Sequence, residues 1–335
     1  MKRKVIAHLW NLPRWFAAPF FGASCLMGSA IAGRINLNAW IAMIAALLVM
    51  AGGHGLNSFL DYAWTGLDKG EKEDRSAEKS YTGGQNLIEN KIVSLKEVLA
   101  NAGVWYILSA IPIIYLAYFS TPLILIPWVF GMAATFWYSW GKFNYTHELS
   151  LGVAVGPLPM LIGAFAVNAN ANWINVLLVS IPFAIVLSFA GLALDEWPDA
   201  EANLKKGVKS LAFEVWKWSD WTEFKSRLMS QRKEPYPGGE TTYITDLGEQ
   251  TFRVKSLNTL QWYLTSWFLL MFFFQGLLIY LGILKPLTAL SFFAFPFLMP
   301  CLLFLKSNFN KWAAITVIVG AMYVVLILVG QIFGG

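Results

Sequence analysis

Nine long apolar stretches are the feature of this sequence that most limits its fold. They cover about residues 15–33, 38–60, 98–119, 122–140, 149–168, 173–194, 258–283, 285–304 and 312–333. Each is near the ~20 residues that an α-helix needs to cross a bilayer. The chain is 57% hydrophobic and 13% charged, with a mean hydropathy of +0.53, which is too apolar for a soluble domain. Because backbone groups in lipid must be hydrogen-bonded internally, we predict an all-α, polytopic membrane protein.

The charged residues predict which end of the bundle faces the cytoplasm. No small-residue cleavage site follows the first apolar stretch, so we expect that stretch to remain in the membrane. If the nine stretches cross in turn, all 25 Lys and Arg except Arg34 and Lys285 fall on one side. The positive-inside rule makes that side cytoplasmic, with the N-terminus inside and the C-terminus outside. All 20 Asp and Glu fall there too, so we expect the polar chemistry at the cytoplasmic face of a cell membrane.

Several common kinds of site are not indicated. Cys25 and Cys301 lie inside predicted spans at no metal-like spacing, and we interpret them as small buried apolar residues. We interpret His54, three residues before Asn57, as a packed polar residue more readily than as a ligand. The sequence has no phosphate-binding loop, dinucleotide fingerprint or nucleophile elbow. We also expect no nucleic-acid partner.

Two acidic clusters stand where apolar stretches end, and carboxylates near hydrocarbon indicate a functional site. The first cluster is Asn57, Asp61 and Asp68, and the second is Asp195, Glu196, Asp199 and Asn203. Residues four apart share a helix face. Asp68 joins the face of Asn57 and Asp61 if the first helix continues past Gly66. In the second cluster, Pro198 must kink or restart the helix. Mg²⁺ is usually held by one or two carboxylates together with phosphate and water. The clusters therefore predict Mg²⁺-bridged binding of a diphosphate.

Basic residues follow both clusters and complete the electrostatics of this predicted site. Arg75 and Lys79 follow the first cluster, Lys209 follows the second, and Lys142 lies between the fourth and fifth spans. A diphosphate leaving group needs its growing negative charge neutralised, which Arg and Lys donors can do. We expect Arg75, Lys79 and Lys209 to contact the diphosphate, and most other lysines to contact water or lipid headgroups.

Three groups of motifs resemble the UbiA superfamily of intramembrane prenyltransferases over about residues 12–212. The first group has Asn57-x3-Asp61, Gly66 to Gly70, Tyr81 to Gly84 and Ser94 to Leu99. The second has Asp195 to Asn203 and Gly207 to Ala212. Between them, Tyr138-Ser139, Glu148-Leu149 and Gly152 to Pro159 are similar to the branch that prenylates dihydroxynaphthoate in menaquinone synthesis.

The resemblance implies a fold, a reaction and a set of site residues. The fold would be about nine helices around a central cavity. The reaction would be Mg²⁺-dependent transfer of a polyprenyl group from an allylic diphosphate to a small aromatic acceptor, in quinone synthesis of the menaquinone type. Asp61 and Asp199 would be catalytic. By motif position the metal ligands would be Asn57, Asp61, Asp68, Asp195 and Asp199, and the substrate-binding residues Asn57, Arg75, Lys79, Lys142, Tyr138 and Lys209.

Departures from the family pattern keep other functions open. Ser58 stands where many members have a second acid, Asn203 stands where the second motif usually ends in Asp, and Trp140-Gly141 replace a common proline-containing turn. The alternatives are a catalytically inactive binding protein and prenyl transfer to a non-quinone acceptor. A transporter is disfavoured because the sequence has no repeated halves and no charges in the middle of a span. The acceptor, the prenyl chain length and the oligomeric state are not specified by the sequence.

We expect residues 1–335 to form one transmembrane domain with a cytoplasmic insertion at about 213–256. In the insertion, Trp216, Trp218, Trp221 and Phe224 alternate with Lys217, Lys225 and Arg227. This pattern is typical of an amphipathic helix in the lipid headgroup layer. Such a helix could serve as a lid over the cytoplasmic opening or as a plain surface anchor.

Overall fold

The computed structural model describes residues 2–69, 86–197, 203, 206–219, 246–305 and 309–334. For residues 86, 216–219, 246–258 and 309–310 only the backbone is described. Within the described residues the secondary structure is helical throughout, without a β-strand, which confirms the predicted all-α class. Arg75, Lys79, Asp199 and the insertion's aromatic residues, from Trp216 to Phe224, have side chains outside the described part.

The helices follow one another with short connections. The N-terminal half has α1 (Lys2–Ile6), η1 (Ala7–Asn11), η2 (Trp15–Ala17), α2 (Ala18–Ile31), α3 (Leu37–Ala63), α4 (Asn86–Glu89), α5 (Leu95–Phe119), η3 (Pro122–Ile124) and α6 (Leu125–Gly141). The middle has α7 (His147–Val155), α8 (Pro157–Val167), α9 (Trp173–Ala184), η4 (Ile185–Gly191), α10 (Leu192–Glu196) and α12 (Leu211–Ser219). The chain ends with α14 (Asp246–Tyr280), η6 (Pro286–Ala294), α15 (Phe295–Phe304) and α16 (Phe309–Phe333).

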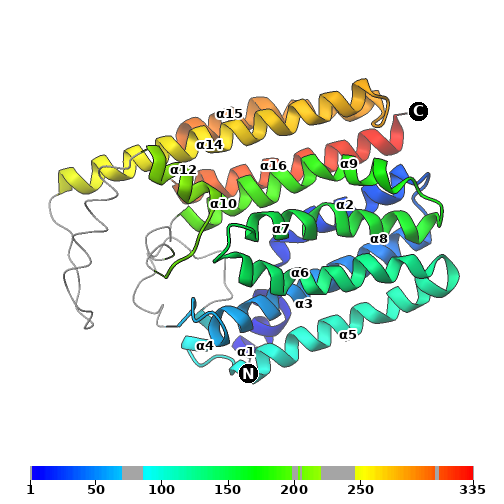
Figure 1. The fold of residues 1–335 in the computed structure, drawn as a ribbon, viewed down its shortest axis with the longest axis horizontal. Coiled ribbons are helices and arrows are strands. Elements are labelled where there is room, and N and C mark those ends of the chain that lie inside the picture. The colour runs from blue at the N-terminus through cyan, green and yellow to red at the C-terminus, as the bar shows by residue number, and fades with distance from the viewer. Residues whose placement is uncertain are drawn as a thin grey trace.

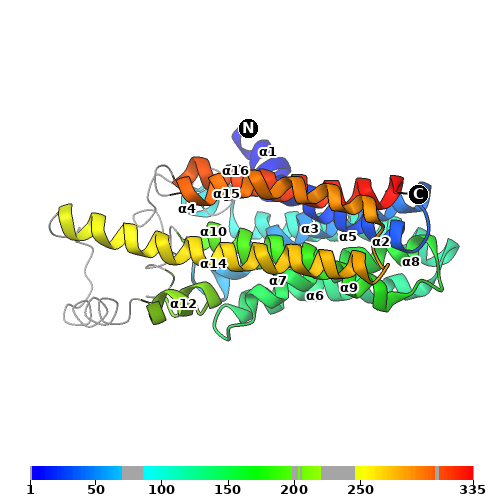
Figure 2. The ribbon, with the colours of Figure 1, turned by 90° about the horizontal axis from the view of Figure 1, so that it is seen from above.

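The long helices lie side by side along one common axis (Figure 1). Seen from above, α14, α15 and α16 run along the outside of the bundle, and α14 extends past its neighbours at one end (Figure 2). The same end holds α4, α10 and α12, together with the end of α3 and the start of α7 (Figure 1). This is the end that the charge pattern predicts to be cytoplasmic, and it is where both acidic clusters begin.

Eight helical segments in the described residues are long and apolar enough to cross a membrane. They run from Leu37–Ala63 to Lys311–Phe333 and correspond in order to eight of the nine predicted stretches. The remaining stretch, 15–33, forms η2 and the 14-residue α2, most of whose residues are buried. It is therefore a shorter helix inside the bundle.

The fifth and sixth predicted spans are interrupted helices. The stretch at 149–168 breaks into α7 and α8 at Gly156, because Pro157 has no N–H to continue the hydrogen-bonded ladder. The stretch at 173–194 contains the π-helical turn η4, three residues after Pro182. Because each π turn takes more residues than an α turn, η4 rotates everything after it, including Asp195, relative to a continuous α-helix.

Small residues allow the central helices to approach each other closely. A Cβ at Gly28 of α2 would overlap the Met160 carbonyl oxygen of α8, and one at Gly163 would overlap the Cys25 carbonyl oxygen. Ser29 Oγ also donates to the Gly163 carbonyl oxygen at 2.8 Å across the same contact. Gly52 of α3 allows a similar close contact, since a Cβ there would lie 2.7 Å from the Tyr106 ring of α5. These contacts bring the backbones together as in other membrane helix pairs.

Candidate functional site

Two members of the first acidic cluster, Asn57 and Asp61, lie on the last two turns of α3 and are buried. Asn57 Nδ2 donates to Asp61 Oδ2 at 3.0 Å, as expected for residues four apart on one helix face. Ser139 of α6 donates to Asn57 Oδ1 at 3.1 Å. Because Ser139 fixes which amide atom of Asn57 accepts, the amide nitrogen is left to face Asp61. The predicted shared face of Asn57 and Asp61 is confirmed.

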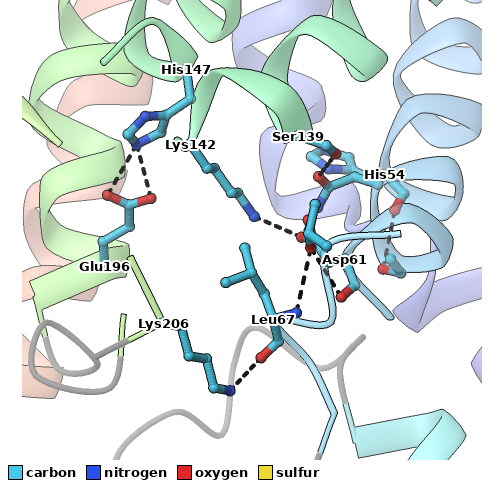
Figure 3. Close-up of polar contacts among 11 residues, drawn as sticks. His54, Asp61, Leu67, Ser139, Lys142, His147, Glu196 and Lys206 are labelled. Carbon is cyan, nitrogen blue, oxygen red and sulfur yellow. Dashed lines mark hydrogen bonds and ion pairs between the residues drawn. The ribbon is translucent and has the colours of Figure 1, made fainter. Parts of the chain in front are cut away.

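Lys142, just after α6, balances the charge of Asp61. Its Nζ lies 2.7 Å from Asp61 Oδ2, and the two side chains point toward each other (Figure 3). Nζ also lies 5.0 Å from the centre of the Tyr138 ring, close enough for a cation–π contact. Burial alone lowers the pKa of Lys142, but the negative charges of Asp61, Asp68 and Glu196 outweigh it, and the pKa stands above its ordinary value. Lys142 is therefore a cation fixed inside the site.

Asp68 joins the first cluster although α3 ends at Ala63. Gly66 adopts a positive φ of 69°, a conformation that glycine tolerates, and the chain turns back there. The Asp68 amide then donates to the Asp61 carbonyl oxygen at 3.2 Å, and Asp68 is buried. Lys206 Nζ donates to the carbonyl oxygen of Leu67, which ties the segment after the second cluster to this turn (Figure 3). The helix does not run on to Asp68, but the turn returns Asp68 to the site.

The second acidic cluster begins at the end of α10. Asp195 lines a cavity, and its Oδ1 is buried without a hydrogen-bond partner. The next residue, Glu196, is buried and bound by His147, whose Nε2 lies 3.2 Å from Glu196 Oε1. The main-chain carbonyl oxygen of Asn203 accepts a hydrogen bond from the Val208 amide at 2.9 Å. Asp199 lies outside the described residues, so the predicted common face of Asp195, Asp199 and Asn203 stays a prediction.

His147 connects the two clusters from the first turn of α7. Its imidazole is fully buried and lies between two carboxylates, with Nδ1 3.1 Å from Glu148 Oε2 but without hydrogen-bond alignment. The ring also packs edge-on against Tyr138, with 5.8 Å between ring centres. Figure 3 shows His147 and Glu196 across the same space that Lys142 and Asp61 face. Since Tyr138 also contacts Lys142, one aromatic ring bridges the two pairs.

Backbone contacts connect this network to the segment after the second cluster. The Leu211 amide, at the start of α12, donates to Glu148 Oε1 at 2.5 Å. The Lys209 amide donates to the Lys142 carbonyl oxygen at 2.7 Å. The Lys209 side chain is exposed, and its Nζ lies 5.3 Å from the centre of the Tyr145 ring. The structure thus places Lys209 next to the α6–α7 connection, at the rim of the site.

A largely apolar cavity opens beside both clusters. About 1070 Å³ of empty space, part of it open to solvent, lies between α2, α3, α6, α7, α8, η4 and α10. Asn57, Tyr138 and Asp195 line it near the helix ends, whereas Ala46 and Leu187 line it farther along their helices. From Ala46 to Asn57 the helical rise corresponds to roughly 16 Å. The cavity therefore has a polar end and an apolar interior long enough for several isoprene units.

The predicted Mg²⁺ can be tested against the donor atoms. Asp61 Oδ1 and Asp195 Oδ1 are both buried acceptors without a hydrogen-bond partner, and such atoms are costly unless a cation or donor satisfies them. Both are hard oxygen donors, which Mg²⁺ prefers. Among the described residues, no three His, Cys, Asp or Glu side chains come close enough together to hold a metal by themselves. The donors therefore fit a cation that takes its remaining ligands from phosphate and water.

Several residues of this site were not predicted from the sequence as site residues. They are Ser139, His147, Glu148, Lys206 and Arg14, the last of which lines the cavity. Glu148 could have been found as a single acidic residue at the start of an apolar stretch. It is also part of the Glu148-Leu149 motif of the resemblance. Ser139 belongs to the Tyr138-Ser139 motif of the resemblance, but the motif gave it no role. No local pattern indicated a role for Ser139 or His147, because their partners lie 82 and 49 residues away in the chain.

Comparisons with known proteins were made with the whole chain. No protein-family model and no curated protein matches it. Among solved structures, the chain is similar to a UbiA homolog from Archaeoglobus fulgidus bound to DMAPP and Mg²⁺, with 13% sequence identity and a TM-score of 0.45. The similarity covers 77% of this chain and 97% of that chain.

Proposed function

We propose that this protein is an intramembrane prenyltransferase that moves a polyprenyl group from an allylic diphosphate to a small aromatic acceptor with the aid of Mg²⁺. The observation that carries the proposal is the position of Asp61 and Asp195. Each presents a buried carboxylate oxygen without a partner, from two different helices, beside the polar end of one apolar cavity. A molecule with an anionic head and a long apolar tail matches this arrangement, and the sequence motifs favour the same substrate.

The described residues suggest how the substrate would lie. The diphosphate would lie at the polar end, where Lys142 and Lys209 neutralise its charge, and the isoprenoid tail would enter the apolar interior. Mg²⁺, when bound, supplies positive charge that stabilises the departing diphosphate. We propose Asn57, Asp61, Asp68 and Asp195 as its ligands, with Asp199, Arg75 and Lys79 assigned from the motifs alone.

The reaction would proceed by breaking the allylic C–O bond, whose electron pair leaves with the diphosphate. A ring carbon of the acceptor then forms the new C–C bond and loses its proton, which leaves with the diphosphate. The Tyr138 ring, held against Lys142, lines the cavity near this point. The apolar walls exclude water, which would otherwise convert the allylic cation to an alcohol.

A transporter is the weaker alternative on the described residues. In the eight candidate spans, acidic side chains occur only in the first or last turns on the side of the two clusters: Asp61, Glu97, Glu148, Asp195 and Glu196. A transport path would be expected to carry charge near the middle of the membrane. We further propose that this side is cytoplasmic and that the acceptor belongs to quinone synthesis of the menaquinone type, as the motifs favour.

The test is a transfer assay with purified protein in detergent. Radiolabelled geranylgeranyl diphosphate and longer polyprenyl diphosphates are offered with a panel of hydroxylated benzene and naphthalene acceptors in Mg²⁺. We expect a radiolabelled prenyl–aromatic product from at least one pair. Asp195→Asn is the matched control, because it keeps the size of the side chain and removes its charge. Binding of the diphosphate without any product would instead favour the inactive binding protein.

A further inference from the structure

A short helix at the start of the chain lies across the bundle. α1 continues into η1 without a break, so residues 2–11 form one helical segment, the 2–11 helix. It lies at the end of the bundle where α5 begins, which also holds α4 (Figure 1). Seen from above, it points away from the long helices and across their common axis (Figure 2). Because the long helices cross the membrane, the 2–11 helix lies along the membrane surface.

One face of the 2–11 helix is fixed to the start of α5. Lys4 Nζ lies 2.5 Å from Glu97 Oε1. Asn101, one turn after Glu97, donates through Nδ2 to the His8 carbonyl oxygen at 3.2 Å. The buried apolar contacts on this side are made by Ala7, Leu12, Leu87, Val93 and Val98. The helix therefore has a defined position on the bundle.

The opposite face of the 2–11 helix is apolar and uncovered. Its large side chains recur three and four residues apart, as on one face of a helix, and each is at least half exposed: Val5, Ile6, Leu9 and Trp10. We call these four residues the apolar stripe. Exposed apolar side chains that gather on one surface mark a binding site for a protein or a membrane.

The charges beside the apolar stripe indicate the chemistry of its partner. Lys2 and Arg3 are exposed and form no ion pair with a described carboxylate. Trp10 has the amphipathic ring that is enriched where membrane meets water. Basic residues next to an apolar face with Trp are typical of helices that lie in the lipid headgroup layer. The cytoplasmic leaflet carries anionic lipids, which attract Lys and Arg close to the surface.

The neighbouring surface distinguishes lipid from a protein partner. Beyond Asn101, α5 exposes a column of apolar side chains to its outside: Val104, Ile107, Ile111 and Ile114. α5 is one of the helices long and apolar enough to cross the membrane, so these residues face hydrocarbon. The 2–11 helix lies at the headgroup end of this column. A soluble protein bound to the apolar stripe would have to displace the lipid that meets α5 there.

From these observations we infer that the 2–11 helix binds anionic phospholipid. The apolar stripe lies among the upper parts of the acyl chains, and Lys2 and Arg3 contact the headgroup phosphates. The inference goes beyond the proposed function and does not depend on it. The lipid surface also adjoins the cavity, because Trp15 Nε1 donates to the Leu9 carbonyl oxygen at 2.8 Å and the next residue, Phe16, lines the cavity.

The first measurement gives the depth of the helix in vesicles of phosphatidylcholine and phosphatidylglycerol. A nitroxide is attached to full-length protein at Leu9→Cys, with Ile107→Cys as the hydrocarbon standard and Asn170→Cys, in the exposed α8–α9 connection, as the water standard. Cys25 and Cys301 are buried, so wild type carried through the labelling gives the background. We expect the Leu9 nitroxide to collide more with oxygen and less with a neutral nickel chelate than the Asn170 nitroxide.

The second measurement tests the headgroup charge. Labelled protein in detergent is titrated with dioctanoyl phosphatidylglycerol or dioctanoyl phosphatidylcholine, and the mobility of the Leu9 nitroxide is followed. Half-saturation should need ~10-fold less of the anionic lipid, since each basic residue near the headgroups adds to the attraction. Lys2→Gln with Arg3→Gln should remove this preference. Lys91→Gln with Lys96→Gln is the matched control, because it removes the same charge from exposed residues at the same end, and it should keep the preference.

Thermal unfolding of each variant checks its folding. The inference is overturned if the Leu9 nitroxide meets the nickel chelate as often as the Asn170 nitroxide does, which would place the helix in water. It is also overturned if the two lipids bind equally, if the Lys2 and Arg3 variant keeps the preference, or if the control variant loses it as well. Dipolar broadening of the Leu9 signal that disappears on dilution with unlabelled protein would show instead that a second copy of the chain covers the apolar stripe.

Discussion

Asp61 and Asp195 are carboxylates from opposite sides of one site, yet their surroundings differ. Asp61 is fully buried, and its Oδ2 is bound by Asn57 and Lys142. Asp195 is partly buried, forms no ion pair with a described residue, and is held in place only through its neighbour Glu196. The comparison indicates that the chain balances the charge of Asp61 itself and leaves that of Asp195 for a ligand. Asp61 should then contribute to stability as well as catalysis, and Asp195 to catalysis alone.

The largest effect is expected from Asp61→Ala, which should lower both turnover and stability. Turnover should fall at least ~10²-fold, because a group that stabilises the transition state is lost. Thermal unfolding should show a loss of about 3 kcal/mol or more, because Lys142 is left buried without its partner. The double variant Asp61→Ala with Lys142→Met should recover most of the stability and none of the activity. Equal stability of the two variants would show that the ion pair is unimportant.

Asp195→Asn should separate catalysis from stability. We expect a fall in turnover of at least ~10²-fold in the transfer assay, with the unfolding midpoint equal to or above that of wild type. The reason is that this carboxylate has no protein partner to lose. Asp199→Ala carries the same expectation for turnover from its place in the motif. A destabilised Asp195→Asn protein would contradict the assignment of the two roles.

Variants of His147 and Glu196 test whether the contact between these two residues keeps the second acidic cluster in position. His147→Phe keeps a ring against Tyr138 but removes the contacts to Glu148 and Glu196. Because Glu196 then no longer fixes the end of α10, we expect the KM for the diphosphate to rise ~10-fold, within the range seen for partners of metal ligands. The effect on kcat should be smaller. Glu196→Gln keeps a hydrogen-bond acceptor for His147 and should stay near wild type.

The smallest effect concerns pH and the Lys142 ion pair. The folded-state pKa of Lys142 is raised, so its contribution to stability is complete below the unfolded value of about 10.4 and is lost as pH rises through the folded pKa. The difference in unfolding midpoint between wild type and Lys142→Met should therefore stay constant from pH 7 to about pH 10 and shrink above it. A difference that disappears by pH 9 would show that the charge on Lys142 contributes little.

The sequence predicted the parts of this molecule that depend on local pattern. The lengths of the apolar stretches predicted the membrane-spanning helices. The four-residue spacing of Asn57 and Asp61 predicted that they share a helix face. The direction of Asp195 could not be predicted, because η4 adds residues to its turns and rotates the helix after Pro182. Asp68 reaches the site by a turn at Gly66, which the periodicity of a continuous helix does not include.

Local sequence patterns did not predict the contacts between segments that are far apart in the chain. The Lys142–Asp61 pair depends on how α6 packs against α3. The His147–Glu196 pair depends on how α7 packs against η4, which continues into α10. The spacing of residues along one helix does not specify how that helix packs against another. No pattern indicated that Arg14 belongs to the site, because a basic residue just before a predicted span is expected from the positive-inside rule alone.

Equilibrium binding of radiolabelled geranylgeranyl diphosphate tests the central claim most directly, that both clusters hold one diphosphate through Mg²⁺. It is measured for wild type, Asp61→Asn and Asp195→Asn, each with Mg²⁺ and with EDTA. The account predicts Mg²⁺-dependent binding by the wild type that weakens at least ~10-fold in each variant and in EDTA. Binding that is equally tight in EDTA, or unchanged when either carboxylate is replaced, would contradict it.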